Sequence, residues 1–142
     1  MDPKIVLMSI AGFAVLWCLT VYLISLFSGW KALSTIHENR SAPEGQTFKM
    51  QSIIFGKFIG YNNCLTIHVS KKKLTITPWP IFSIGHPPLA FSWKEVRHLK
   101  AQKGLFGTTY LYHLGNKVRK KAAFSAAVHQ AIQKAQMGQL SD

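Results

Sequence analysis

The pattern of hydrophobic and polar positions opens with an unbroken apolar run, Ile5–Phe27, that holds no charged residue. At ~1.5 Å rise per residue this run makes ~34 Å of helix, enough to cross a hydrocarbon core of ~30 Å. Trp30 and Lys31 follow it and suit the headgroup level of a bilayer. We therefore predict a transmembrane helix and take residues 1–31 as a membrane anchor.

Two other interpretations of the apolar run remain. A cleavable signal peptide has a basic n-region, a shorter apolar core and a small-x-small cleavage site, whereas only Lys4 precedes the long core of this chain. A buried helix of a soluble domain is the second alternative. It would need more chain to cover it on every side than the residues that follow the anchor supply.

The pattern changes twice after the anchor. Residues 32–46 are mixed and mostly polar, which predicts a linker interrupted at Pro43 and Gly45. In residues 47–138 the hydrophobic period becomes two, which is typical of strands. We expect six or seven short antiparallel strands, separated by turn signals at Gly60–Asn63, Lys71–Lys73, Gly104–Gly107 and Gly115–Asn116.

Helical spacing returns at the end of the chain. Ser125 is a predicted N-cap and Gly138 a predicted stop. Val128, Ala131, Ile132 and Ala135 would share the apolar face of this helix. The expected fold is therefore a membrane-anchored, mostly-β domain closed by a C-terminal helix.

The segment Pro78–Leu89 interrupts the strand pattern. Its four prolines preset the backbone and exclude a regular central strand. Because rigid loops on a β-sandwich often carry binding residues, Trp79 and His86 are candidate contacts for a partner. The alternative is a rigid connector in which Trp79 and Phe82 cover the core.

A strand meander followed by a helix resembles the pleckstrin-homology-like (PH-like) and GRAM-like domains, in which an antiparallel sandwich or barrel of six or seven strands is closed by a C-terminal helix. A second resemblance rests on Asn63-Cys64-Leu65-Thr66, Leu74, Ile84-Gly85-His86-Pro87-Pro88-Leu89 and Ser92-Trp93. Through these residues, roughly a quarter of the chain is similar to a group of small bacterial single-pass membrane proteins without an assigned function. That resemblance implies a place in the inner membrane and carries no implication about catalysis.

The charge balance narrows the choice of partners. The chain holds 17 Lys and Arg against 5 Asp and Glu, a net charge of +12. A basic domain beside a bilayer favours anionic headgroups, at ~1 kcal/mol per basic residue near the surface. A solvated basic face is the alternative, and nucleic acid is disfavoured because the C-terminal helix holds only Lys134. The candidate lipid- or anion-binding residues are Lys71, Lys72, Lys73, Lys117, Arg119, Lys120 and Lys121.

Catalytic chemistry is not indicated. Glu95 is the only carboxylate between Thr47 and Gln139, which excludes a paired-carboxylate mechanism in that segment. Cys64 begins a predicted strand and is better explained as a small buried residue than as a nucleophile. The six histidines lack metal-ligand spacing. We expect a non-catalytic protein with no metal and no cofactor.

Basic residues slightly favour the C-terminal side of the span, which predicts an outside N-terminus and a cytoplasmic domain. The predicted function is a single-pass protein of the cell (inner) membrane whose basic PH-like domain is an interaction module for an anionic lipid surface or a membrane partner protein. The alternative is an accessory or assembly subunit of a membrane complex. Ala14 and Cys18 would offer the small-residue helix face that such a subunit needs.

Overall fold

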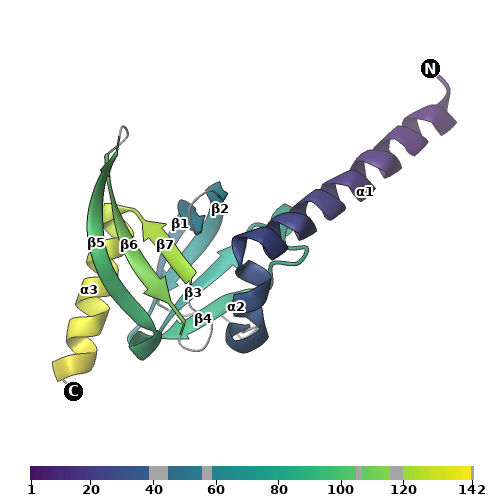
Figure 1. The fold of residues 1–142 in the computed structure, drawn as a ribbon. Coiled ribbons are helices and arrows are strands. Elements are labelled where there is room, and N and C mark those ends of the chain that lie inside the picture. Colours follow the sequence, from purple (N-terminus) through teal and green to yellow (C-terminus); the bar gives the residue numbers. More distant parts are fainter. Residues whose placement is uncertain (39–44, 56–58, 105–106, 116–119, 142) are drawn as a thin grey trace.

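The computed structural model describes residues 1–38, 45–55, 59–104, 107–115 and 120–141. Within these residues the fold has a long apolar helix, a short second helix, seven strands and a C-terminal helix (Figure 1). The helices are α1 (Pro3–Ser28), α2 (Trp30–His37) and α3 (Ala126–Ser141), with 3-10 turns η1 (Pro80–Phe82) and η2 (Trp93–Glu95). The strands are β1 (Gln46–Phe55), β2 (Ile59–Val69), β3 (Lys73–Pro78), β4 (Leu89–Ser92), β5 (Val96–Gly104), β6 (Gly107–Leu114) and β7 (Lys120–Phe124).

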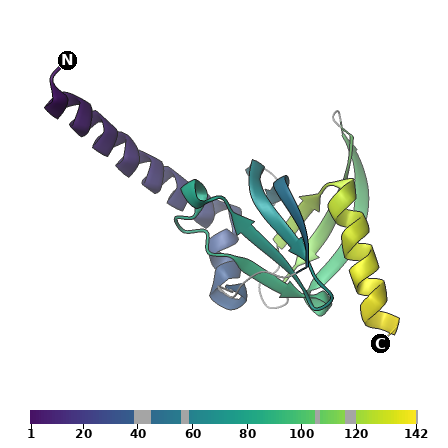
Figure 2. The ribbon, with the colours of Figure 1, turned by 180° about the vertical axis from the view of Figure 1, so that it is seen from behind.

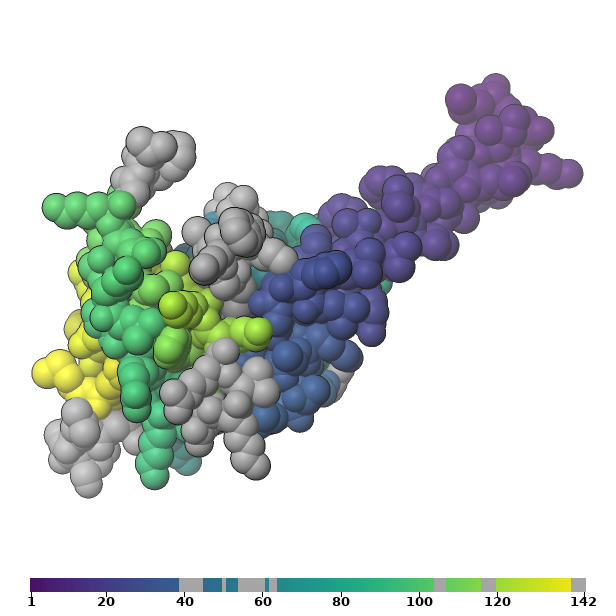
Figure 3. Space-filling view, viewed as in Figure 1, coloured from purple at the N-terminus to yellow at the C-terminus, as the bar shows by residue number. Residues whose placement is uncertain are grey.

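Helix α1 projects away from the β domain over most of its length (Figure 3). The side chain of Asp2 accepts a hydrogen bond from the backbone N–H of Lys4 and so caps the first turn. Only 11% of its most apolar 18-residue window is buried, and Phe13 and Phe27 are 66% and 78% exposed. The helix is long and apolar enough to cross a membrane, and most of it is not covered by the described part of the domain.

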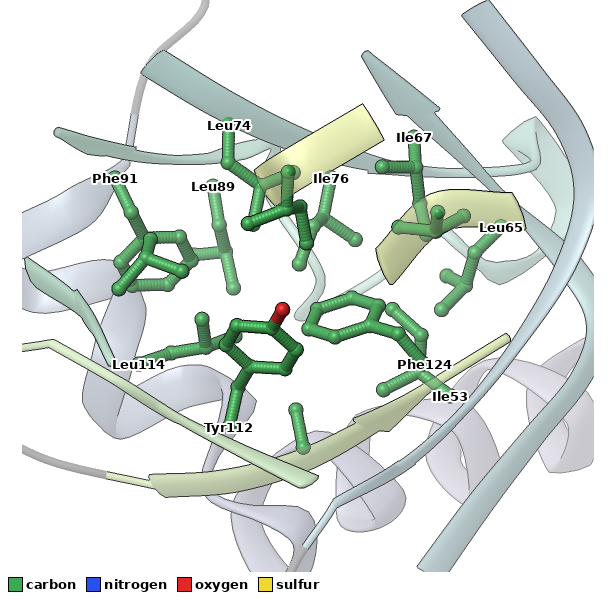
Figure 4. Packing of buried hydrophobic residues seen from close by; sticks show 14 of the residues in the cluster. Ile53, Leu65, Ile67, Leu74, Ile76, Leu89, Phe91, Tyr112, Leu114 and Phe124 are labelled. Carbon is green, nitrogen blue, oxygen red and sulfur yellow. The ribbon is translucent and has the colours of Figure 1, made fainter. Parts of the chain in front are cut away.

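The strands form one antiparallel sheet in the order β4-β3-β2-β1-β7-β6-β5. Strand β1 joins its two halves, because it pairs with β2 along its length and with β7 only at Ile54 and Phe55. The half made by β1 to β4 therefore diverges from the half made by β5 to β7, and the two face each other across the core (Figure 4). Strands β4 and β5 are the edges, so the described part of the sheet is not a closed barrel.

The core lies between the two halves of the sheet (Figure 4). Its largest side chains are fully buried because the inward positions of each strand alternate with outward ones. Val128 and Ile132 are both 0% exposed, which confirms that this face of α3 packs on the core, where Phe124 of β7 is also fully buried. The other fully buried members include Leu65, Ile67, Leu74, Ile76, Leu89, Phe91, Tyr112 and Leu114.

Helix α3 differs from its predicted bounds. The carbonyl of Ser125 accepts the first helical bond, from the N–H of His129 at 2.9 Å, whereas the Ser125 hydroxyl donates to Gln51 Oε1. The predicted stop at Gly138 is wrong, since the helix continues to Ser141. Gly138 is not among the glycines with positive φ, so it continues the helix at the usual cost of ~1 kcal/mol relative to alanine.

Two further sequence predictions are corrected. The expected turn at Gly60–Asn63 lies within β2, where Tyr61 pairs with Ile53 and its side chain is buried. The first part of the expected linker is α2, which buries Trp30, Leu33, Ser34 and His37 on one face. That i, i+3, i+4, i+7 spacing is the reason this segment packs as a helix. Residues 39–44 lie outside the described part of the chain.

Candidate functional site

A buried cluster joins the end of α1 to the β domain. It contains one residue from the last turn of α1, one from α2, one from β2 and one from the loop before β4. We call it the junction, and its members are Ser28, Trp30, Tyr61 and His86.

Gly29 turns the chain between α1 and α2 with a φ of +91°. A Cβ atom at this position would lie 2.4 Å from Lys120 Cε, so the Lys120 side chain passes directly over the turn. The left-handed backbone favours glycine here, whereas the flexible end of the Lys120 side chain could shift to admit a Cβ atom.

Trp30 is the centre of the junction and is 0% exposed. Its indole N–H donates to the carbonyl of Pro87 at 2.9 Å. The rings of Tyr61 and His86 meet it edge-on, with centroid distances of 5.4 and 5.1 Å. Trp30 was predicted to face the headgroups, but α2 instead turns this side chain into the core of the domain.

The hydrogen bonds of the junction form a chain in which each group donates to the next, from the N–H of Trp30 to the carbonyl of Ile84. His86 Nδ1 lies 2.9 Å from the carbonyl oxygen of Ile84, which can only accept, so Nδ1 carries the proton. In the neutral ring Nε2 then accepts from the Tyr61 hydroxyl at 2.9 Å. The Tyr61 oxygen accepts from Ser28 Oγ at 2.7 Å, and Ser28 Oγ accepts from the N–H of Trp30 at 3.2 Å. This order of donors requires a neutral His86.

The electrostatics of the junction agree with that order. Burial lowers the pKa of His86 below its ordinary value of 6.5 and outweighs the opposing hydrogen bond to Ile84. Burial also raises the pKa of Tyr61 to about 12, against the smaller effect of the Ser28 hydrogen bond. Both side chains are therefore uncharged near neutral pH.

We expect the free energy of unfolding to decrease on acidification. The pKa of His86 is lower in the folded chain than in the unfolded chain, so the unfolded chain binds more protons between these two values. The stability is fully present above about pH 6.5 and is lost as the pH falls toward the folded pKa. Thermal unfolding of the full chain in neutral detergent, followed from neutral to acidic pH, measures this slope.

The control for this experiment is His86→Gln, which cannot titrate and should flatten the slope. His68 and His129 also have pKa values lowered by burial. An unchanged slope in His86→Gln would assign the acid sensitivity to those two residues and contradict the role given to His86.

The proline-rich loop, defined here as Pro78–Pro88, lies along one side of α1 (Figures 1 and 2). The indole N–H of Trp17 donates to the carbonyl of Ile81 at 2.7 Å, and the Trp17 ring lies 5.3 Å from that of Phe82. At the other end of the loop, a Cβ on Gly85 would lie 2.6 Å from Ser25 Oγ. The loop therefore contacts α1 over about two helical turns.

The two loop residues predicted to contact a partner, Trp79 and His86, differ in exposure. His86 is 1% exposed, so its predicted role as a surface contact is wrong; its ring is held inside by Trp30 and Tyr61. Trp79 is 37% exposed and stays on the surface. Phe82 packs against the core, as the connector interpretation predicted.

The candidate basic residues lie toward opposite ends of the sheet. Lys71 and Lys72 line a pocket of about 520 Å³ together with Lys134, which sequence reasoning did not assign to a site. We call this the basic pocket; its walls also include Gly45, Gln46, Val69, Ser70, Ala131 and Ala135. In contrast, Lys120 lies over Gly29 at the junction.

The basic pocket and the junction lie at opposite ends of β2. Strand β2 runs from Tyr61 at the junction to Val69 at the basic pocket, and at ~3.3 Å per residue this distance is roughly 26 Å. Figure 2 shows the turn between β2 and β3 beside α3, away from α1. The structure therefore does not place Lys71 and Lys72 on one face with Lys120.

The remaining candidate cations are not members of the basic pocket. Lys73 begins β3, and Lys121 is exposed on β7. Lys117 and Arg119 lie outside the described residues.

Groups with catalytic potential are used in packing and capping. Glu95 accepts hydrogen bonds from the backbone N–H and the hydroxyl of Ser92, and it lies 3.5 Å from His37 Nδ1. Cys64 is buried, and burial raises the pKa of its thiol. Among the described residues no group of three or more His, Cys, Asp or Glu is placed to hold a metal ion.

Comparisons with protein-family models, with curated proteins and with solved structures return no match for this chain. Its function is therefore inferred from its own geometry.

Proposed function

We propose that this chain is a non-catalytic, single-pass membrane protein whose PH-like domain is an interaction module for an acidic protein partner. The observation that carries the proposal is the junction, which makes α1 a continuation of the folded domain. Trp30 is fully buried there, and hydrogen bonds link Ser28 of α1 to Tyr61 of β2. A helix attached in this way holds the domain in one orientation relative to the bilayer.

The attachment also favours a retained anchor over a cleaved leader. Trp17 and Ser28 lie in α1 and make contacts with the β domain through Ile81 and Tyr61. Cleavage would remove these contacts from the mature protein. With α1 retained as an anchor, the slight excess of basic residues on the C-terminal side of the span favours a cytoplasmic domain.

The strand order supports the PH-like assignment. Four strands follow one another as a meander, three more complete the second half, and α3 packs its apolar face on the core between them. Non-catalytic use is supported by the structural role of Glu95 and by the burial of Cys64.

The position of the basic pocket favours a protein partner over lipid. The pocket lies at the end of β2 away from the junction, so a bilayer crossed by α1 would be on the opposite side of the domain. Lys71, Lys72 and Lys134 are exposed at its rim, and Val69 and Ala131 give it an apolar floor. Such a surface suits a carboxylate-bearing segment with small apolar side chains.

The test uses the full chain in nanodiscs of neutral phosphatidylcholine and a fluorescent oligoglutamate peptide as the probe. Replacement of Lys71, Lys72 and Lys134 by Gln should weaken binding by about tenfold or more, at ~0.5 kcal/mol or more per exposed charge contact. Salt should weaken the binding of the unchanged protein in the same way.

The matched control replaces Lys94, Lys100 and Lys103, which are exposed elsewhere on the domain, by Gln. This variant loses the same charge and should retain peptide binding. Equal weakening in both variants would show that net charge alone attracts the peptide. Binding to added phosphatidylserine vesicles without binding to the peptide would favour lipid instead.

A further inference from the structure

The contact between Trp17 and Ile81 sets the depth of the proline-rich loop. The part of α1 that precedes Trp17 begins at Pro3 and makes only ~21 Å of helix. A hydrocarbon core of ~30 Å needs about six residues more. If α1 spans the bilayer, the hydrocarbon extends at least to Tyr22, and the loop segment bonded to Trp17 lies inside it.

The side chains of this loop suit that depth. The sequence has no Asp, Glu, Lys or Arg between Lys73 and Lys94. The large side chains that the loop exposes are apolar: Trp79 is 37% exposed, Ile81 58% and Ile84 39%. In water this cluster would be an unfavourable apolar surface, whereas acyl chains would cover it favourably.

Several polar backbone groups of the loop have partners inside the protein, as a medium without water requires. Non-helical backbone is tolerated at membrane depth only where its polar groups find partners inside the protein. Four residues of the loop are prolines and have no N–H to satisfy. Four others donate their N–H groups to backbone carbonyls: Trp79, Phe82, Ser83 and His86.

Three carbonyl groups of the loop accept hydrogen bonds from ring N–H groups. Trp17 would carry an unpaired N–H in the hydrocarbon, and the carbonyl of Ile81 accepts it. The carbonyl of Ile84 accepts from His86 Nδ1, and that of Pro87 accepts from the Trp30 indole.

We propose that the proline-rich loop is a membrane-inserted loop whose tip, Trp79 to Ile84, lies among the acyl chains of the leaflet next to the domain. The inference rests on the proposed function in one respect, since it takes α1 to span the bilayer. Two elements, α1 and the loop, then enter the same leaflet side by side. The domain cannot rotate away from the membrane surface without withdrawing the loop.

Spin-label accessibility tests this position in the full chain. Nitroxide labels are attached to single cysteines in a Cys18→Ala, Cys64→Ala background reconstituted in phosphatidylcholine vesicles. The tested positions are Ile81→Cys and Ile84→Cys, whose exposed side chains make substitution tolerable. Leu19→Cys reports whether α1 is in lipid, and Lys94→Cys is the aqueous control.

The expected result is an oxygen-to-nickel-complex accessibility ratio at Ile81 and Ile84 several-fold above that at Lys94 and similar to that at Leu19. A lipid value at Leu19 with aqueous values at both loop positions would overturn the inserted loop and leave the anchor intact. An aqueous value at Leu19 would instead overturn the anchor, and with it the proposed function.

A second measurement needs no label in the loop. The tryptophan fluorescence of the unmodified chain and of Trp79→Phe is compared in vesicles of brominated lipid. The difference between the two is the Trp79 signal, which the inserted loop predicts to be quenched several-fold. An unquenched difference signal would contradict the insertion of Trp79.

Discussion

Trp30→Ala is expected to lower the free energy of unfolding by about 3–5 kcal/mol. The indole is 0% exposed, so its removal leaves a cavity at the point where α1 meets the domain. It also leaves the carbonyl of Pro87 without the indole donor that lies 2.9 Å away. Denaturant unfolding of the full chain in detergent, followed by circular dichroism, measures the change.

The matched control is Trp79→Ala, which removes the same atoms from a side chain that is 37% exposed. We expect a change of less than about 1 kcal/mol in detergent, because surface substitutions of this kind are usually small. A loss for Trp30→Ala no larger than that of Trp79→Ala would contradict the description of the junction as the attachment of α1.

Gly85→Val is expected to separate the proline-rich loop from α1 and to cost about 2–4 kcal/mol of unfolding free energy. The backbone at Gly85 has a φ of +70°, which a β-branched residue avoids. The added Cβ would also lie 2.6 Å from Ser25 Oγ and 2.8 Å from Tyr22 Cδ2. Unfolding experiments measure the loss, and a spin label at Ile81 reports whether the tip moves.

Gly107→Val is the control that distinguishes backbone strain from a steric clash with α1. Gly107 has a φ of +116°, but nothing lies within 4 Å of the position of its Cβ. This variant should therefore show backbone strain only and leave a label at Ile81 unmoved. Equal losses in the two glycine variants, with no movement at Ile81, would mean that the contact of Gly85 with α1 contributes nothing.

The elements that were predicted correctly are those with a strong local period. The length and uniform apolarity of Ile5–Phe27 define α1, and alternation of apolar and polar residues defines most strands. Val128 and Ile132 were placed on the packed face of α3 because helical spacing alone brings them together. These features depend on residues that are close in the sequence.

The junction and the basic pocket depend on residues that are far apart in the sequence. The contact between Trp17 and Ile81 joins positions 64 residues apart, and Lys134 reaches Lys71 only after α3 has packed on β2. No local period contains this information. One signal was available for α2, since Trp30, Leu33 and His37 have the spacing of a buried helix face.

The edge strand β5 carries positive charge, which affects how two copies of the chain would meet. Proteins confined to a membrane diffuse in two dimensions and meet one another at high local concentration, where an unpaired sheet edge invites strand addition. The edge at β5 exposes Arg97, Lys100 and Lys103, whereas the edge at β4 is bridged by Glu38 through Leu89. Two copies that approach along β5 bring like charges together. This repulsion would disfavour strand addition at β5.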